Sequence, residues 1–261
     1  MTQERNFNVG KIIVGGLDRV VDFITLLLIL LILLFGFYSL WDSHSVYAAA
    51  DAANFKVYKP SVDNSMSFEE LQKRNPDVFA WLNVYNTHID YPVVHYSDDV
   101  KYLNTDALGN YNLAGAVFLD CDNNIHFTDF NSIIYGHHMD QKEMFGELTD
   151  FDEESFFDSH RYGSLWYDGE EHGLELFAYI PADAYDETLY TIAVEEPEKQ
   201  QKYLDNIYSK AKYSRVADVT VNDRIVLLST CSSYETNGRA ILAGKITEHA
   251  AGGSTDRKTE R

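Results

Sequence analysis

Residues 224–246 read RIVLLSTCSSYETNGRAILAGKI, two apolar runs typical of β-strands joined by a polar stretch. The first run ends at Cys231 and the second begins at Arg239, so the pattern predicts two strands connected by a short loop. Pairing of these strands would bring Cys231 and Arg239 onto neighbouring positions of one sheet. A thiol would then lie at the polar exit of a strand, beside a guanidinium.

Six further short apolar runs, separated by turn residues, indicate more strands. They are AWLNV (80–84), IDYPVV (89–94), AGAVFLD (114–120), NSIIYG (131–136), LELFAYI (174–180) and YDETLYTIAV (185–194). Their irregular spacing and the lack of an internal repeat argue against a propeller or solenoid and favour a closed or nearly closed barrel. The 18 Tyr and 15 Phe residues also suit a mainly β domain.

Two helices are expected in the same part of the chain. Ser67 and Glu70 have the order of a capping box, which predicts a helix that ends near Asn75 and marks the start of the folded domain. A second, amphipathic helix is predicted between Pro197 and Tyr213. Its apolar face would carry Tyr203, Leu204, Ile207, Tyr208 and Ala211.

The uncharged run FITLLLILLILLFGFYSLW, residues 23–41, is long enough to cross a bilayer as a helix. Basic residues precede it, at Arg5, Lys11 and Arg19, and none follows before Lys56. The positive-inside rule therefore places the N-terminus in the cytoplasm and the rest of the chain outside the cell. A cleaved signal peptide, with Val46-Tyr47-Ala48 as its processing site, is the alternative.

These patterns divide the chain into five segments. We expect a cytoplasmic N-terminus over 1–22, a single transmembrane anchor over 23–41 and an extracellular stalk over 42–66. The main folded domain would then span 67–249, and the polar, aperiodic residues 250–261 would form a flexible tail.

Charge and cysteine content narrow the class of function. Of 261 residues, 21 are Lys or Arg and 41 are Asp or Glu, and the net charge of −20 would repel a phosphate backbone, so nucleic acid is not an expected partner. Only Cys121 and Cys231 are available, too few for a disulfide framework. One Cys121–Cys231 bridge is the alternative to a free Cys231, and Cys121 is otherwise expected to be a small buried or loop residue.

His137 is the imidazole most suited to assist a thiol. It follows the apolar run at 133–135 and Gly136, again at the exit of a strand, where a flexible glycine would let the ring project over the sheet edge. An imidazole beside a cysteine lowers the thiol pKa and later protonates a leaving amine. His138 is weaker because adjacent residues on an extended chain face opposite sides. The alternatives are a buried structural Cys231 and a surface Arg239.

No metal or cofactor is predicted. The GHHM sequence at 136–139 suggests zinc, but neither HExxH nor a pair of CxxC motifs is present. The acidic loop at 121–131 lacks the spacing and glycine of a calcium-binding hand and is expected to be a solvated turn. No glycine-rich phosphate loop is found.

The segments NSIIYGHHM (131–139) and LLSTCSSYETNGR (227–239) together resemble the two signature regions of the sortase family. Sortases carry a Gly-His pair after a strand, a T-L-x-T-C type segment, and an arginine on the following strand. Residues 91–120 and 144–151, and the helix before the cysteine strand, resemble class B sortases. The likeness covers about residues 67–247. Leu227 departs from it, since many sortases have Thr there, and Cys121 has no catalytic counterpart.

This resemblance implies an eight-stranded β-barrel with an N-terminal helix and a helix inserted before the cysteine strand. It also implies a transpeptidase that cleaves a C-terminal sorting signal of secreted surface proteins. Cys231 would attack the backbone carbonyl to form a thioacyl enzyme, His137 would transfer protons, Arg239 would support the oxyanion, and Thr230 would assist.

The implied acceptor is an amine of the cell-wall peptidoglycan or, in pilus assembly, a pilin lysine. Two further functions stay open at this point. An extracellular Cys-His wall peptidase would hydrolyse its substrate instead of transferring it. A surface protein with a degenerate site would not be an enzyme.

Overall fold

The computed structural model describes residues 2–61, 66–192, 194–231 and 237–250, with side chains from Gly15 onward except that of Cys231. The chain divides into two units, residues 1–48 and 49–261. The first unit belongs to one long helix, and the second contains every strand that the structure describes.

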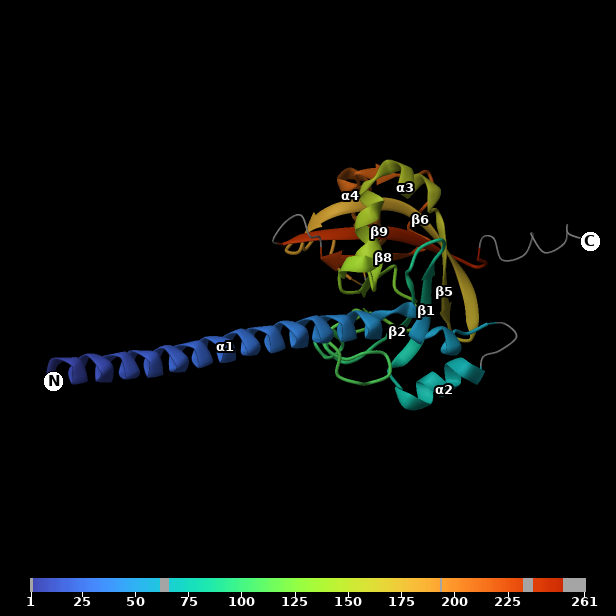
Figure 1. The fold of residues 1–261 in the computed structure, drawn as a ribbon. Coiled ribbons are helices and arrows are strands. Elements are labelled where there is room, and N and C mark those ends of the chain that lie inside the picture. The colour runs from blue at the N-terminus through green and yellow to red at the C-terminus, as the bar shows by residue number, and fades with distance from the viewer. Residues whose placement is uncertain (1, 62–65, 193, 232–236, 251–261) are drawn as a thin grey trace, which may run out of the picture. The chain divides into compact units, whose positions relative to one another are not determined.

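The second unit is built around a β-barrel (Figure 1). Eight of the described strands follow one another in the order β5-β1-β2-β3-β4-β8-β9-β6, and pairing of β5 with β6 closes the ring. The short strand β7 is added to β6. The strands are β1 Val78–Val84, β2 Asp90–Val94, β3 Val117–Leu119, β4 Asn131–Tyr135, β5 Tyr162–Tyr167, β6 Glu170–Asp183, β7 Tyr213–Ser214, β8 Arg224–Cys231 and β9 Gly238–Thr247. The predicted eight-stranded barrel is confirmed.

Strand β8 occupies an interior position because it is apolar along most of its length. Residues 225–228 are fully buried, as expected for a strand covered on both faces. It pairs in parallel with β4 and antiparallel with β9. In the parallel pair Tyr135 lies opposite Ser229. The residues that follow these two positions therefore emerge at the same end of the barrel.

Short helices surround the barrel. The α-helices of the second unit are α2 Met66–Arg74, α3 Glu154–Ser159 and α4 Pro197–Lys210, and the 3₁₀ segments are η1 Ala52–Asn54, η2 Lys56–Tyr58, η3 Lys101–Leu103, η4 Asp140–Lys142 and η5 Gly146–Asp152. In Figure 1, α2 lies beside β1, whereas α4 lies over β6. Both predicted helices are thus present, and α4 buries Tyr203, Leu204 and Ile207 as expected.

Helix α2 begins earlier than its sequence suggested. Its first residue is Met66, so Ser67 lies inside the helix and is not its N-cap. Residues 62–65, which precede it, lie outside the described residues. The predicted end is confirmed, because the helix stops at Arg74 and the Asn75 N–H donates to the Leu71 carbonyl.

The predicted strand at 185–194 is wrong. Its described residues form turns and irregular chain instead, and the Asp186 carboxylate accepts a hydrogen bond from the Thr188 hydroxyl. Two of its main-chain groups are satisfied by a buried side chain, because the Asn131 amide donates to the Thr191 carbonyl and accepts from the Val194 N–H. Leu189 and Val194 still enter the core. Their burial explains why the sequence of this segment has the apolar alternation that is typical of a strand.

Strand β5 was not predicted from the sequence YGSLWY. Gly163 and Ser164 interrupt its apolar pattern, and glycine weakens a strand prediction. The reason for the glycine is close packing on β1. A Cβ at Gly163 would lie 2.5 Å from the Asn83 carbonyl oxygen.

The first unit is formed by helix α1, Thr2–Ala50. From Gly15 onward it is long and apolar enough to cross a membrane, and its large apolar side chains between Leu17 and Trp41 are exposed. The run predicted to span the bilayer, 23–41, lies within it. The first part of the predicted stalk is also helical, since α1 continues to Ala50 and is followed by η1 and η2.

Candidate active site

A cavity of about 150 Å³ opens where β4 and β8 end and β9 begins. It brings together three of the residues singled out from the sequence, His137, Thr230 and Arg239. Among the residues whose side chains the structure describes, the lining is Leu103, Phe118, Tyr135, Gly136, His137, Ser229, Thr230 and Arg239. Segments far apart in the sequence therefore meet at one end of the barrel, as the parallel pairing of β4 and β8 requires.

His137 is half-buried and is held from two directions. Its Nε2 lies 2.9 Å from the Leu103 carbonyl oxygen, and its own carbonyl accepts the Phe145 N–H at 3.0 Å. Gly136 before it does not have a positive φ. It is required because a Cβ there would lie 2.7 Å from the Phe145 ring. Glycine is therefore needed at position 136 because the Phe145 ring packs closely against it, and not for the backbone flexibility that the sequence suggested.

Cys231 and Arg239 are direct partners in the β8–β9 ladder, as the sequence predicted. The side chain of Cys231 lies outside the described residues. Arg239 is half-buried, and its Nη1 donates to the Gly238 carbonyl at 3.1 Å. The guanidinium thus borders the cavity immediately across from the last residue of β8.

Thr230 is 3% exposed, and its hydroxyl has no hydrogen-bond partner among the described residues. A buried polar atom without a partner costs free energy unless another group, such as a substrate, satisfies it. Thr230 lines the cavity, so a ligand there could supply that partner. His138, by contrast, is not part of the lining, and burial lowers its pKa. The preference for His137 over His138 agrees with this placement.

One wall of the cavity is aromatic, and sequence analysis did not predict it. The rings of Phe118 and Tyr135 lie 5.3 Å apart, and Tyr190 stacks on Tyr135 at 6.5 Å. Tyr190 also shares a 2.9 Å hydrogen bond with the Ser229 hydroxyl. Burial and the neighbouring Asp120 raise the pKa of Tyr135. The phenol therefore stays protonated and donates to Asp120 at 2.9 Å.

Comparison with known proteins identifies the family, although no family model matches the chain. Sortase B of Staphylococcus aureus is 28% identical over 241 residues, which cover 88% of this chain and 98% of that protein. Sortase B of Listeria monocytogenes is 33% identical over 212 residues, covering 78% and 82%. The chain belongs to the class B sortase family.

Solved structures support the same assignment. The crystal structure of sortase B from the type II pilus of Streptococcus pneumoniae is 46% identical and matches with a TM-score of 0.62, covering 70% of this chain and 99% of that one. A class B sortase is a cysteine transpeptidase, so this chain is an enzyme of that type.

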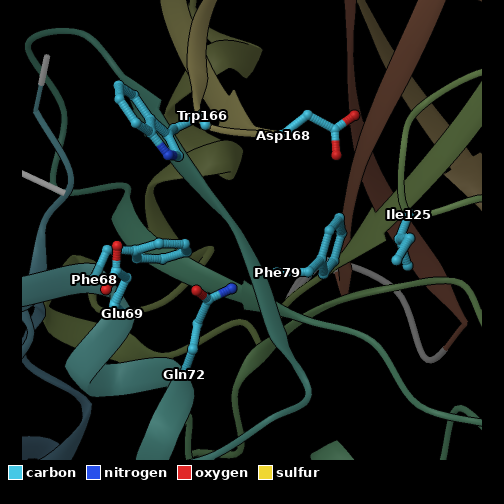
Figure 2. A pocket seen from close by; sticks show the side chains of 8 residues that line it. Phe68, Glu69, Gln72, Phe79, Ile125, Trp166 and Asp168 are labelled. Atoms are coloured by element: carbon cyan, nitrogen blue, oxygen red, sulfur yellow. The ribbon is translucent and has the colours of Figure 1, made fainter. Parts of the chain in front are cut away.

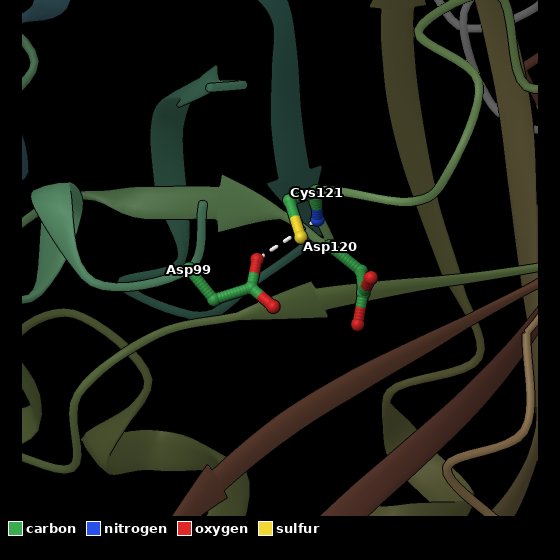
Figure 3. A group of neighbouring side chains, drawn as sticks. All are labelled: Asp99, Asp120 and Cys121. Atoms are coloured by element: carbon green, nitrogen blue, oxygen red, sulfur yellow. Dashed lines mark hydrogen bonds between the residues drawn. The ribbon is translucent and has the colours of Figure 1, made fainter. Parts of the chain in front are cut away.

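The two cysteines of this sortase lie in different surroundings. Cys121 is a half-buried loop residue that follows β3, and its thiol is free in this structure. Figure 3 shows its thiol directed at Asp99, with Asp120 beside them. Burial, and then the negative charge of Asp99, raises the pKa of the Cys121 thiol to about 11. The thiol is protonated at neutral pH and is a poor nucleophile.

The loop at 121–131 is more ordered than the predicted solvated turn. Asn123 is buried and donates to the Asp129 carboxylate and the Asn131 carbonyl. Phe127 is fully buried against Tyr167, with ring centroids 4.8 Å apart. The loop thus packs as part of the domain.

A larger pocket, of about 420 Å³, lies between helix α2 and strands β1 and β5 (Figure 2). Its lining is Phe68, Glu69, Gln72, Phe79, Ile125, Trp166, Asp168 and Gly169. None of these described lining residues is a cysteine or a histidine, so they do not supply the groups for acyl transfer. The smaller cavity is the candidate active site despite its size.

Proposed function

We propose that this sortase uses Cys231 to cleave the sorting signal of secreted surface proteins and transfers them to an amine of the cell-wall peptidoglycan. One observation carries the choice of nucleophile. A cysteine transpeptidase needs a reactive thiol, the chain has two cysteines, and the pKa of Cys121 is raised to about 11. Cys231 is the remaining thiol, and its position ends the strand that borders the cavity.

The residues around the cavity support a role for each partner of Cys231. His137 supplies the imidazole that accepts and returns a proton. Arg239, the cross-strand partner of Cys231, supplies positive charge where an oxyanion develops. The Thr230 hydroxyl, which lacks a partner in the described part of the chain, supplies a further hydrogen bond to the bound peptide.

In the proposed reaction the thiol proton passes to His137 as sulfur attacks the scissile carbonyl carbon. A C–S bond forms, the carbonyl electrons move onto oxygen beside Arg239, and the tetrahedral intermediate collapses. The C–N bond breaks, and the leaving amine takes the proton from His137. The acceptor amine then attacks the thioester, gives its proton to His137, and releases the thiol when that proton returns to sulfur.

The nature of both substrates is proposed from relatives. Sortase B of Staphylococcus aureus has been solved in a substrate complex, and a sortase B has been solved in complex with triglycine. A peptide donor and an amine-bearing peptide acceptor are therefore the expected substrate classes. The aromatic wall of Phe118 and Tyr135 offers apolar surface for a side chain of the donor peptide.

Pilin polymerisation is the second candidate function. Two class B sortases associated with pili, from Streptococcus pneumoniae and Streptococcus pyogenes, are 46% and 38% identical to this chain. In that case the acceptor would be a lysine side chain of a pilin subunit. The same thioacyl intermediate serves both functions, and only the amine differs.

We further propose that α1 anchors the enzyme with its N-terminus in the cytoplasm and the barrel outside. The basic residues Arg5, Lys11 and Arg19 lie on the N-terminal side of the apolar run. Protease treatment of intact cells tests this orientation. The barrel should be digested and an N-terminal tag protected, and the reverse pattern would contradict it.

The deciding experiment incubates the full-length protein in detergent micelles with a library of sorting-signal peptides and either triglycine or a lysine-containing peptide. Mass spectrometry should find a new amide product that Cys231→Ala abolishes. A product with triglycine supports wall anchoring, and a product with lysine alone supports pilin polymerisation. Hydrolysis without transfer would support the peptidase alternative and overturn the proposal.

A further inference from the structure

The imidazole of His137 is oriented by a main-chain carbonyl that lies 34 residues earlier in the chain. Its Nε2 is 2.9 Å from the Leu103 oxygen. A carbonyl oxygen only accepts hydrogen bonds, so Nε2 must carry the proton. In the neutral ring the other nitrogen, Nδ1, is then unprotonated and free to accept one.

Gly115 makes this arrangement possible. It has a φ of +62°, which favours glycine, and a Cβ there would lie 2.4 Å from the Tyr102 oxygen and 2.9 Å from the Leu103 oxygen. The same Cβ would lie 3.1 Å from Cδ2 of His137, the carbon next to Nε2. Gly115 therefore packs against both the carbonyl and the edge of the ring that binds it.

The residue before Leu103, Tyr102, is anchored on both its side chain and its main chain. Tyr102 is fully buried, and its hydroxyl donates to the Asp77 carboxylate at 2.8 Å, while the Asn75 amide donates to that hydroxyl at 3.0 Å. The Ala116 N–H donates to the Tyr102 carbonyl at 3.0 Å. The peptide group between Tyr102 and Leu103, which directly precedes the one that carries the Leu103 carbonyl, is thus held by both ends of one loop, residues 101–116.

We propose that the Leu103 carbonyl is the orienting group of the catalytic imidazole and that Gly115 is a positioning residue for it. Nδ1 of His137 is then the nitrogen that exchanges protons with Cys231 and with the leaving and entering amines, while Nε2 keeps its proton throughout. The Leu103 carbonyl is then the third group of a Cys-His arrangement, and it comes from the main chain instead of a side chain. The inference rests on the proposed role of His137.

The tautomer is measured directly on the unmodified protein. Full-length enzyme labelled with ¹⁵N-histidine in detergent micelles is studied by long-range ¹H–¹⁵N NMR, and His137 is assigned by the signals that His137→Gln loses. The spectrum of the neutral ring should show a protonated Nε2 and an unprotonated Nδ1. A protonated Nδ1 would overturn the proposal whether or not the enzyme turns over a given peptide.

A matched pair of glycine variants tests the positioning role. Gly115→Ala should lower kcat by about 100-fold, because a displaced imidazole is poorly aligned for proton transfer, while KM changes by less than about threefold. Gly109→Ala is the control. Gly109 lies in the same loop with φ +86°, but a Cβ there would meet nothing within 4 Å.

The two variants therefore share the backbone strain and differ in the contact with the carbonyl and the ring. Gly109→Ala should keep the kcat of the parent enzyme. A Gly115→Ala protein that folds, as judged by circular dichroism, and keeps the parent kcat would contradict the positioning role. If no peptide is turned over by the parent enzyme, the proposed function fails, and the tautomer measurement still decides the orientation of the ring.

Discussion

The protonated state of Cys121 predicts slow alkylation of this thiol in the folded enzyme. Its pKa is raised from 9.0 to about 11, which lowers the thiolate fraction at pH 8 by nearly 100-fold relative to an ordinary thiol. A more basic thiolate is intrinsically more nucleophilic, by about tenfold over two units. The two effects leave Cys121 about tenfold less reactive in the folded protein than in the unfolded one.

The assay follows iodoacetamide alkylation of Cys121 by peptide mass spectrometry in the Cys231→Ala background. Between pH 7 and about 10 the rate in the folded protein should rise with pH without levelling off, because the pKa lies above this range. The same protein in urea is the control and should level off near pH 9. Asp99→Asn should lower the pKa only in part, since burial is its larger cause. A folded-state rate that levels off at or below pH 9 would refute this account of Cys121.

Three further predictions concern the site and its support. Arg239→Ala should lower kcat by about 100- to 1,000-fold, as measured by amide formation, with part of the loss restored by Arg239→Lys; an unchanged kcat would remove Arg239 from the mechanism. Gly136→Ala should lower the free energy of unfolding by about 1–3 kcal/mol in urea titrations, because its Cβ would lie 2.7 Å from the Phe145 ring; parental stability would contradict this packing. Burial would raise the pKa of Glu147, but hydrogen bonds from the His88 main chain and ring and from Lys142 outweigh it and hold that pKa below 4.5. The stability that ionised Glu147 contributes should be present above pH 4.5 and be lost as pH falls through its lower folded-state pKa. The difference in free energy of unfolding between the parent enzyme and Glu147→Gln should therefore shrink on acidification. A difference that grows on acidification would contradict the lowered pKa of Glu147.

Much of the site was predictable because its residues end recognisable strands. The apolar run before Cys231 and the run before Gly136 form β8 and β4, and their parallel pairing brings both exits to one end of the barrel. The short sequence separation between Cys231 and Arg239 predicted their cross-strand pairing correctly, because a short connection between antiparallel strands allows few registers.

The parts that were missed come from loops, whose path leaves no periodic pattern in the sequence. Leu103 acts through a main-chain oxygen, so its side chain gives no signal of its role. Gly115 could be identified as a special backbone position only once the loop was seen against His137. The raised pKa of Cys121 likewise depends on Asp99, which is 22 residues away in the chain.

Segment 185–194 shows why an apolar alternation can mislead. Leu189 and Val194 are buried as strand residues would be, but the Thr191 carbonyl and the Val194 N–H bond to the Asn131 side chain and not to a neighbouring strand. Strand β5 is the opposite case, since Gly163 weakens its pattern for the sake of close packing against Asn83. In both places a single partner residue, distant in sequence, outweighed the local pattern.

The identity of the acylated cysteine tests the central claim most directly. The full-length enzyme is incubated, without an acceptor amine, with a sorting-signal peptide that it cleaves. The reaction is quenched in acid, and the digested enzyme is mapped by mass spectrometry. The acyl group should be found on Cys231, and Cys121→Ala should form it as readily as the parent enzyme while Cys231→Ala forms none. An acyl group on Cys121, or transpeptidation that survives Cys231→Ala, would contradict the assignment of the nucleophile.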